Sequence, residues 1–153
     1  MTSIARPAPR RLASFAVPSV PGNERIALTQ VAETVAGLGL SPARLDKLKT
    51  AVAEATMNAI EHGNGSRSEL PVDVEVFHSG TEIMVTISDR GGQHDVGRPE
   101  DRAEVPDLSR KLACEQSPRG WGLFLIRHMV DAMDVTTEGE RHTVRLMMRT
   151  GST

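Results

Sequence analysis

Three polar residues recur at intervals of four along one otherwise apolar segment: Glu54, Asn58 and His62. This spacing places side chains on one face of a helix, so the three groups would project together. A carboxylate can serve as a general base, and a neutral amide oxygen suits a hard cation such as Mg²⁺. A solvated polar stripe that ends at Gly63 explains the same spacing. The segment alone leaves both interpretations open.

A second candidate is Asp89, which directly follows an apolar strand and precedes Arg90, Gly91 and Gly92. A carboxylate at a strand end can accept a hydrogen bond from a donor group on a ring. The glycines would let a ligand approach the backbone closely. Aspartate followed by glycine is also common in plain turns, and this segment taken alone favours a turn.

A third candidate is a glycine turn that opens a helix and contains Gly120, Trp121, Gly122 and Leu123. Free backbone N–H groups and the helix dipole make such a start a site for anions. No strand precedes the turn, and neither a third glycine nor a Lys-Ser/Thr pair follows it. A Rossmann fingerprint and a Walker A loop are therefore both excluded. An ordinary helix N-terminus remains the alternative.

Hydrophobic periodicity predicts the elements that must position these groups. The second helix has a clear start, with Ser41 as N-cap and Pro42 at the first helical position. Helices are predicted over about 23–38, 42–62 and 123–133, with a short one at 108–115, and strands over 12–17, 72–76, 83–88, 135–138 and 143–148. This order predicts an α+β fold: a two-layer α/β sandwich in which helices cover one face of a mixed, mostly antiparallel sheet. Residues 1–10 are predicted to be a flexible tail, and 11–150 one domain.

Composition excludes several classes of function. A net charge of −2 and 3% aromatic residues argue against nucleic-acid binding. No apolar run is long enough to span a membrane. The single cysteine, Cys114, cannot form an internal disulfide, which favours a reducing compartment and a cytoplasmic location. The histidines are too widely spaced to predict a zinc site.

Together, the three motifs resemble those of the GHKL (Bergerat-fold) ATPases, and within them the anti-sigma factor serine/threonine kinases of the RsbW type. The segment from Glu54 to Gly63 matches the N box of that family, Asp89-x-Gly91 its first glycine box, and 120–123 its second. The resemblance covers about residues 12–149.

The resemblance implies ATP and Mg²⁺ as cofactors. Asn58 would hold the metal, Asp89 would accept a hydrogen bond from the adenine amino group, and Glu54 would take the proton from a protein serine. Residues 93–119 would form the ATP lid. The implied ATP-binding residues are Asn58, His62, Gly63, Asp89, Gly91, Gly120, Trp121, Gly122, Leu123 and Thr143.

Three positions depart from the family pattern, one of which is His94, where a Phe is common after the first glycine box. Trp121 stands between two glycines where the family often has Arg or Met. The last hairpin usually reads Gly-Thr-Thr-Val, and here His142 occupies the place of the first threonine. Thr143 is then the remaining candidate for a polar contact beside adenine.

The resemblance implies an ATP- and Mg²⁺-dependent protein-serine kinase that is also an anti-sigma factor. Such a protein would sequester a sigma factor, phosphorylate a STAS-domain anti-anti-sigma partner on serine, and form a homodimer. One alternative is a nucleotide-dependent regulatory binding module with little or no kinase activity. Another is a small ATPase that works in trans with a different signalling protein.

Overall fold

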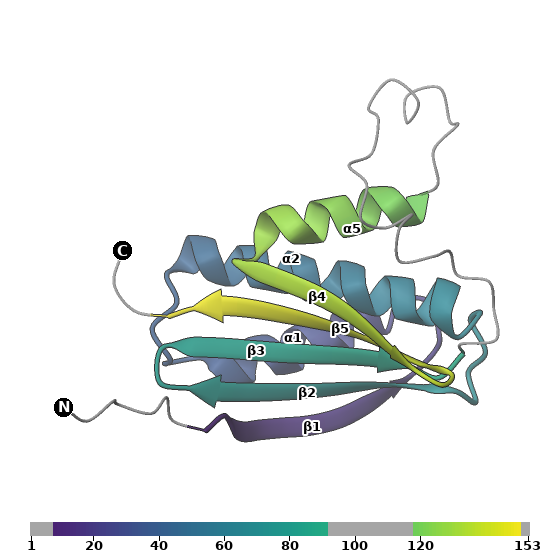
Figure 1. The fold of residues 1–153 in the computed structure, drawn as a ribbon, viewed down its shortest axis with the longest axis horizontal. Helices are drawn as coiled ribbons and strands as arrows, with labels where there is room; N and C mark the ends of the chain where they lie inside the picture. Colours follow the sequence, from purple (N-terminus) through teal and green to yellow (C-terminus); the bar gives the residue numbers. More distant parts are fainter. Residues whose placement is uncertain (1–7, 92–117, 151–153) are drawn as a thin grey trace.

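Five strands pair into one sheet in the computed structural model of the chain, which describes residues 8–91 and 118–150 (Figure 1). The strands are β1 (Arg10–Pro18), β2 (Pro71–Ser79), β3 (Glu82–Asp89), β4 (Ala132–Glu138) and β5 (Arg141–Arg149). Their order across the sheet is β1-β2-β3-β5-β4, and every pairing is antiparallel. The predicted α+β fold class is confirmed, and the described sheet is antiparallel throughout rather than mixed.

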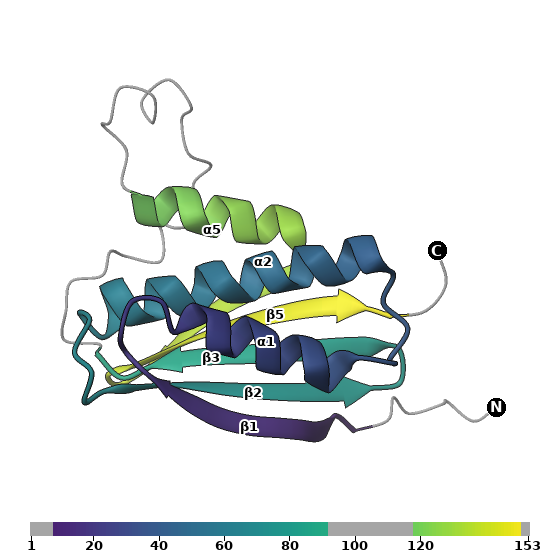
Figure 2. The ribbon, with the colours of Figure 1, turned by 180° about the vertical axis from the view of Figure 1, so that it is seen from behind.

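The helices of the described residues lie on one face of this sheet (Figures 1 and 2). They are α1 (Glu24–Val35), α2 (Pro42–Asn58) with a π-helical turn η1 (Ala59–Gly63) at its end, and α5 (Pro118–Met129). α2 packs between α1 and α5. In the described part of the chain, none of the helices is both long and apolar enough to span a membrane.

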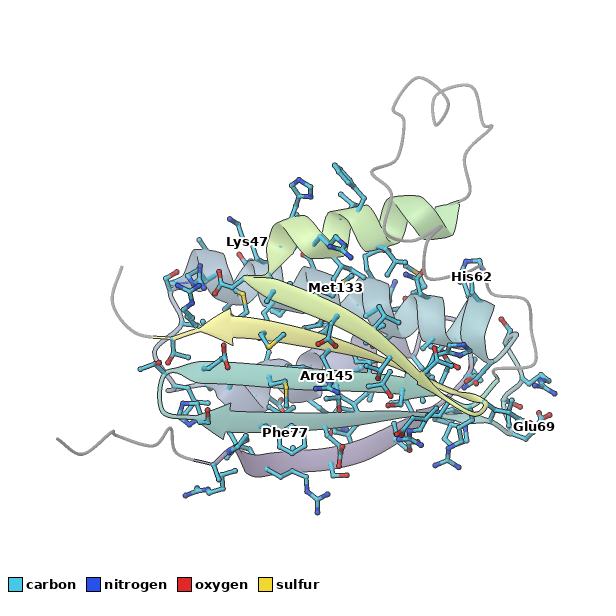
Figure 3. The ribbon with its side chains drawn as sticks, viewed as in Figure 1. Lys47, His62, Glu69, Phe77, Met133 and Arg145 are labelled. Carbon is cyan, nitrogen blue, oxygen red and sulfur yellow. The ribbon has the colours of Figure 1, made fainter. Side chains whose placement is uncertain are left out.

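The core lies between the sheet and the helices. Alternate strand residues such as Val74, Val85 and Ile87 are buried there, as the period of two predicted. Each such side chain stabilises the fold by about 1.5–3 kcal/mol relative to an exposed one. The opposite face of the sheet carries Phe77 and Arg145 instead (Figure 3).

The predicted start of the second helix is confirmed. Pro42 occupies its first turn, and the hydroxyl of Ser41 accepts a hydrogen bond of 3.2 Å from the backbone N–H of Arg44. At its other end the helix widens, because the N–H of Asn64 donates to the carbonyl of Ala59, five residues earlier. Such π-helical turns occur often at functional sites.

The last helix differs from its predicted range of 123–133. α5 begins at Pro118, a residue well suited to the first helical position, so Gly120 and Gly122 lie inside the helix and not in a turn before it. The helix also ends earlier, since Met133 already pairs with β5. The predicted helix at 108–115 and most of the predicted lid lie outside the described residues; positions 118 and 119 of that lid belong to α5.

Asp131, which lies between α5 and β4, links α2 to β5 at the edge of the molecule distant from the first glycine box. Its Oδ2 accepts hydrogen bonds from the guanidinium of Arg44, on α2, and from the backbone N–H of Arg149, on β5, the latter at 2.7 Å. Burial acts to raise the pKa of Asp131, but the Arg149 N–H and the Arg44 guanidinium together outweigh it and lower that pKa.

Candidate functional site

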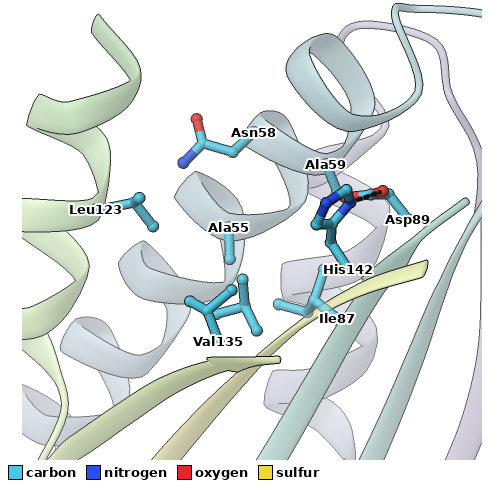
Figure 4. A pocket seen from close by; sticks show the side chains of 9 residues that line it. Ala55, Asn58, Ala59, Ile87, Asp89, Leu123, Val135 and His142 are labelled. Carbon is cyan, nitrogen blue, oxygen red and sulfur yellow. Dashed lines mark hydrogen bonds and ion pairs between the residues drawn. The ribbon is translucent and has the colours of Figure 1, made fainter. Parts of the chain in front are cut away.

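A pocket of about 430 Å³, including the part open to solvent, lies between α2, α5 and the ends of β3, β4 and β5 (Figure 4). Most of its wall is apolar. The described residues that line it are Ala55, Asn58, Ala59, Ile87, Asp89, Leu123, Val135, His142 and Val144.

The polar groups of the pocket lie in two places. Asp89 and His142 meet on one side, and the amide of Asn58 lies apart from them, between α2 and α5 (Figure 4). Apolar walls suit the faces of a flat ring, and a carboxylate at their edge suits a donor group on that ring. The Asn58 amide, apart from Asp89 and His142, is a second polar group that could contact a different part of the same ligand.

Asp89 is the last residue of β3, where the sequence predicted it. Its side chain is only 9% exposed, and its Oδ1 accepts a hydrogen bond of 3.3 Å from the N–H of Gly91. The same oxygen lies 3.2 Å from Nδ1 of His142. The two residues are direct partners in the β3–β5 ladder, so the backbone register fixes this contact.

Two glycines make room around Asp89. A Cβ atom at Gly63 would lie 2.2 Å from Asp89 Oδ2, and a Cβ atom at Gly91 would lie 1.7 Å from the carbonyl oxygen of Gly63. Both distances are impossible for real side chains. A larger residue at Gly63 would displace the Asp89 side chain, and one at Gly91 would displace the backbone of Gly63 and Asn64. Gly63 and Gly91 therefore allow the π-helical turn to pack against the end of β3.

Asn64 holds the same region together and was not predicted. Its side chain is fully buried and donates to the hydroxyl of Ser19 at 2.8 Å and to the carbonyl of Pro71 at 3.1 Å. Its Oδ1 accepts from the N–H of Arg90 at 2.8 Å, directly after Asp89. In the sequence, an asparagine after a glycine is typical of an ordinary helix end, so nothing there predicts that Asn64 would bond to Ser19, Pro71 and Arg90.

Gly122 of α5 approaches the polar face of α2. A Cβ atom there would lie 3.1 Å from Glu54 Oε2 and 3.2 Å from Asn58 Nδ2. The structure thus brings Glu54, Asn58 and Gly122 together from two motifs that are far apart in the chain. Asn58 Nδ2 is buried and has no hydrogen-bond partner among the described residues. An unpaired buried amide is costly, so this N–H group needs a hydrogen-bond acceptor from outside the described side chains.

The carboxyl of Glu54 is partly buried beside this amide. Burial is the main reason that its pKa is raised, and the negative charges of Glu61 and Glu24 raise it further. A raised pKa moves a carboxylate towards the range in which it is an effective general base.

The donor set around Asn58 fits a particular kind of metal site. No group of three or more His, Cys, Asp or Glu residues in the described ranges could hold an ion by itself. Mg²⁺, however, is commonly bound by one or two protein groups together with substrate phosphates and water. Asn58 therefore fits Mg²⁺ that arrives with a phosphate ligand.

The remaining predicted residues are placed as follows. Leu123 lines the pocket, whereas His62 lies at the far end of the α2–η1 segment and does not (Figure 3). Thr143 does not line it either: its hydroxyl lies 2.8 Å from that of Ser88. Side chains alternate along a strand, so His142 faces the pocket and Thr143 faces away. Gly120 and Trp121 lie in the first turn of α5.

The chain matches a known family over most of its length. The model of the histidine kinase-like ATPase domain matches residues 17–148. The chain belongs to this family. Its curated relatives include the anti-sigma F factor of Oceanobacillus iheyensis, 33% identical over 131 residues that make up 85% of this chain and 86% of the relative. The anti-sigma F factor of Pasteuria penetrans is 33% identical over 129 residues, 83% of this chain and 82% of the relative.

Solved structures share the histidine kinase-like ATPase fold. One is the SiaB–SiaC complex of Pseudomonas aeruginosa, with a TM-score of 0.64, 15% identity, and coverage of 91% of this chain and 90% of the matched one. Another contains the RsbU and RsbW domains of Rv1364c of Mycobacterium tuberculosis, with a TM-score of 0.61 and 18% identity over 90% of this chain. This chain spans 32% of that longer one.

Proposed function

We propose that this histidine kinase-like ATPase domain is an ATP-dependent anti-sigma factor with protein-serine kinase activity. The observation that carries the proposal is that the polar groups of one mostly apolar pocket lie in two separate places. Asp89 lies on one side, and Asn58 lies on the other beside Glu54 and Gly122. This division suits a ligand with a base at one end and phosphates at the other.

The adenine ring would lie between the apolar walls, with its amino group donating to Asp89. The triphosphate would extend towards Asn58 and the first turns of α5, where backbone N–H groups at a helix start favour anions. Asn58 would hold Mg²⁺ through its amide oxygen, and the bound metal would neutralise charge on the phosphates. Of the remaining candidates, Leu123 supports the proposal as part of the pocket wall. Trp121, Gly120 and His62 stay proposals from the motif alone. The side chain of Thr143 faces away from the pocket, which does not support a contact with the base.

Glu54 would act as the general base. Its carboxylate would take the proton from a serine hydroxyl as the serine oxygen forms a bond to the γ-phosphorus. The bond from that phosphorus to the β–γ bridging oxygen breaks, and ADP leaves. Positioning and charge stabilisation supply most of the catalysis in such transfers.

The relatives named anti-sigma F factor support a sigma factor as one partner. The proposed phosphate acceptor is a STAS-domain anti-anti-sigma protein, and the proposed assembly is a cytoplasmic homodimer. These partners rest on the resemblance and on the relatives' names.

The test is transfer of label from ATP to a STAS-domain partner, with the phosphorylated residue identified by mass spectrometry. We expect serine labelling by the wild type, loss of labelling in Glu54→Gln with ATP binding retained, and normal labelling in Asp46→Asn. Asp46 is an exposed acid on the same helix, so it is a matched control. Nucleotide binding and sigma sequestration without labelling would refute the kinase and favour the binding module. Absence of nucleotide binding would refute the whole proposal.

A further inference from the structure

We propose that His142 is a positioning residue that gives the pocket its preference for a base with an exocyclic amino group. The inference rests on the proposed nucleotide-binding function. His142 is absent from the implied ATP-binding set, yet it lines the pocket and contacts the carboxylate expected to recognise the base.

The contact between His142 and Asp89 is nearly shielded from solvent. The two side chains are 15% and 9% exposed, and Nδ1 lies 3.2 Å from Oδ1. A carboxylate can only accept, so Nδ1 of His142 carries the proton and donates it. Hydrogen bonds to an ionised group are about twice as strong as neutral ones. With the Gly91 N–H on the same oxygen, the imidazole fixes the rotation of the carboxylate.

The tautomer also determines what this side of the pocket offers a ligand. When Nδ1 donates to Asp89, Nε2 of a neutral imidazole is an acceptor. Asp89 and His142 then both present acceptors to the base. An amino group on a purine supplies the matching donor, whereas a carbonyl oxygen at the same ring position would place acceptor against acceptor. Sites built around such a bond reject analogues that lack it.

A comparison of ATP with inosine triphosphate distinguishes recognition of the amino group from a general contribution of His142 to the shape of the pocket. Inosine carries a carbonyl where adenosine carries the amino group. The measurement is the Kd of each nucleotide with Mg²⁺, by calorimetry on the full chain. The variants are His142→Val, which removes the donor, and His142→Asn, whose amide nitrogen can replace Nδ1. His78→Val is the matched control, since His78 pairs with Ile83 at the opposite end of β3.

In His142→Val we expect ATP binding to weaken about tenfold, because the amino group loses the Nε2 acceptor and the Asp89 carboxylate is no longer held in place. Inosine triphosphate binding should change less than about twofold. His142→Asn should retain the wild-type preference, and His78→Val should not alter it. Thermal unfolding checks that each variant is folded, and His142→Leu replaces the valine variant if that one is not.

Equal weakening of both nucleotides would overturn the inference, because it would show that His142 only shapes the wall. Unchanged or tighter ATP binding in His142→Val would also overturn it, the latter by showing that the imidazole competes with the base for Asp89. If the wild type binds neither nucleotide, the proposed function itself fails. If it binds ATP with a preference that survives in His142→Val, only the role of His142 fails.

Discussion

Replacement of Asn64 by alanine tests whether this buried amide holds the end of β3. The substitution removes two donated hydrogen bonds, to Ser19 and Pro71, and one accepted from the Arg90 N–H. Each such bond contributes about 1 kcal/mol net, and a buried N–H left unpaired costs about 1–3 kcal/mol. The Ser19 hydroxyl keeps its own bond to the Leu70 carbonyl. We therefore expect a loss of about 2–4 kcal/mol in the free energy of unfolding.

Urea unfolding, followed by far-ultraviolet circular dichroism, measures this loss. The matched control is Asn23→Ala, because Asn23 donates one exposed hydrogen bond, to the Pro18 carbonyl. The control should cost less than about 1 kcal/mol. The slope of the transition should stay constant if only native-state stability changes.

The same substitution should reach the pocket, because Arg90 adjoins Asp89. We expect weaker ATP binding by Asn64→Ala under conditions in which the variant is fully folded. Asn64→Asp keeps the acceptor for the Arg90 N–H but loses both donors, so its ATP affinity should lie between those of the wild type and the alanine variant. The reasoning is refuted if Asn64→Ala costs no more stability than Asn23→Ala, or if ATP affinity does not change.

Four further substitutions test other parts of the structure. The raised pKa of Glu54 means that ionisation destabilises the fold as pH rises above the unfolded-state value, so Glu54→Gln should raise the unfolding free energy at pH 7. The wild-type transfer rate should fall on acidification at a higher pH than for an ordinary glutamate. Because the pKa of Asp131 is lowered in the folded protein, its ionised carboxylate stabilises the fold at pH values above the unfolded-state pKa of about 3.8. Asp131→Asn should therefore cost about 1 kcal/mol of unfolding free energy at pH 7. In acid titrations this difference should vanish as the pH falls through the lowered pKa of the folded state. Gly63→Ala should lower the melting temperature and weaken ATP binding together, since its methyl group would overlap Asp89. Gly122→Ala should weaken binding with little loss of stability, because alanine favours the helix by about 1 kcal/mol while its methyl group would crowd Asn58.

Local pattern was sufficient to predict most of the fold. Strand alternation identified residues such as Val74 and Ile87 as buried, and the Ser41–Pro42 pair gave the start of α2. The start of α5 was predicted too late, because the two glycines were interpreted as a turn. Glycine is only moderately unfavourable in a helix, and Pro118 at the first position already suits a helix start.

The site was harder to predict where contacts depend on packing between distant segments. Nothing near Asn64 in the sequence shows that Ser19 and Arg90 will lie beside it. His142 is different, because a signal was present. Val144 and Leu146 alternate towards the core, and the same period of two places His142 on that face and turns Thr143 away.

Several features that lower stability border the same pocket. Within the described residues, Nδ2 of Asn58 is buried without a hydrogen-bond partner, the carboxyl of Glu54 has a raised pKa, and Gly122 occupies a helical position where alanine would be favoured. The π-helical turn lies directly after these α2 residues. Natural proteins keep locally unfavourable residues, such as unpaired buried polar groups or glycines in helices, mainly at functional sites, where the function compensates for the lost stability. This clustering supports the pocket as the site of function by an argument that does not depend on the motifs or on the relatives' names.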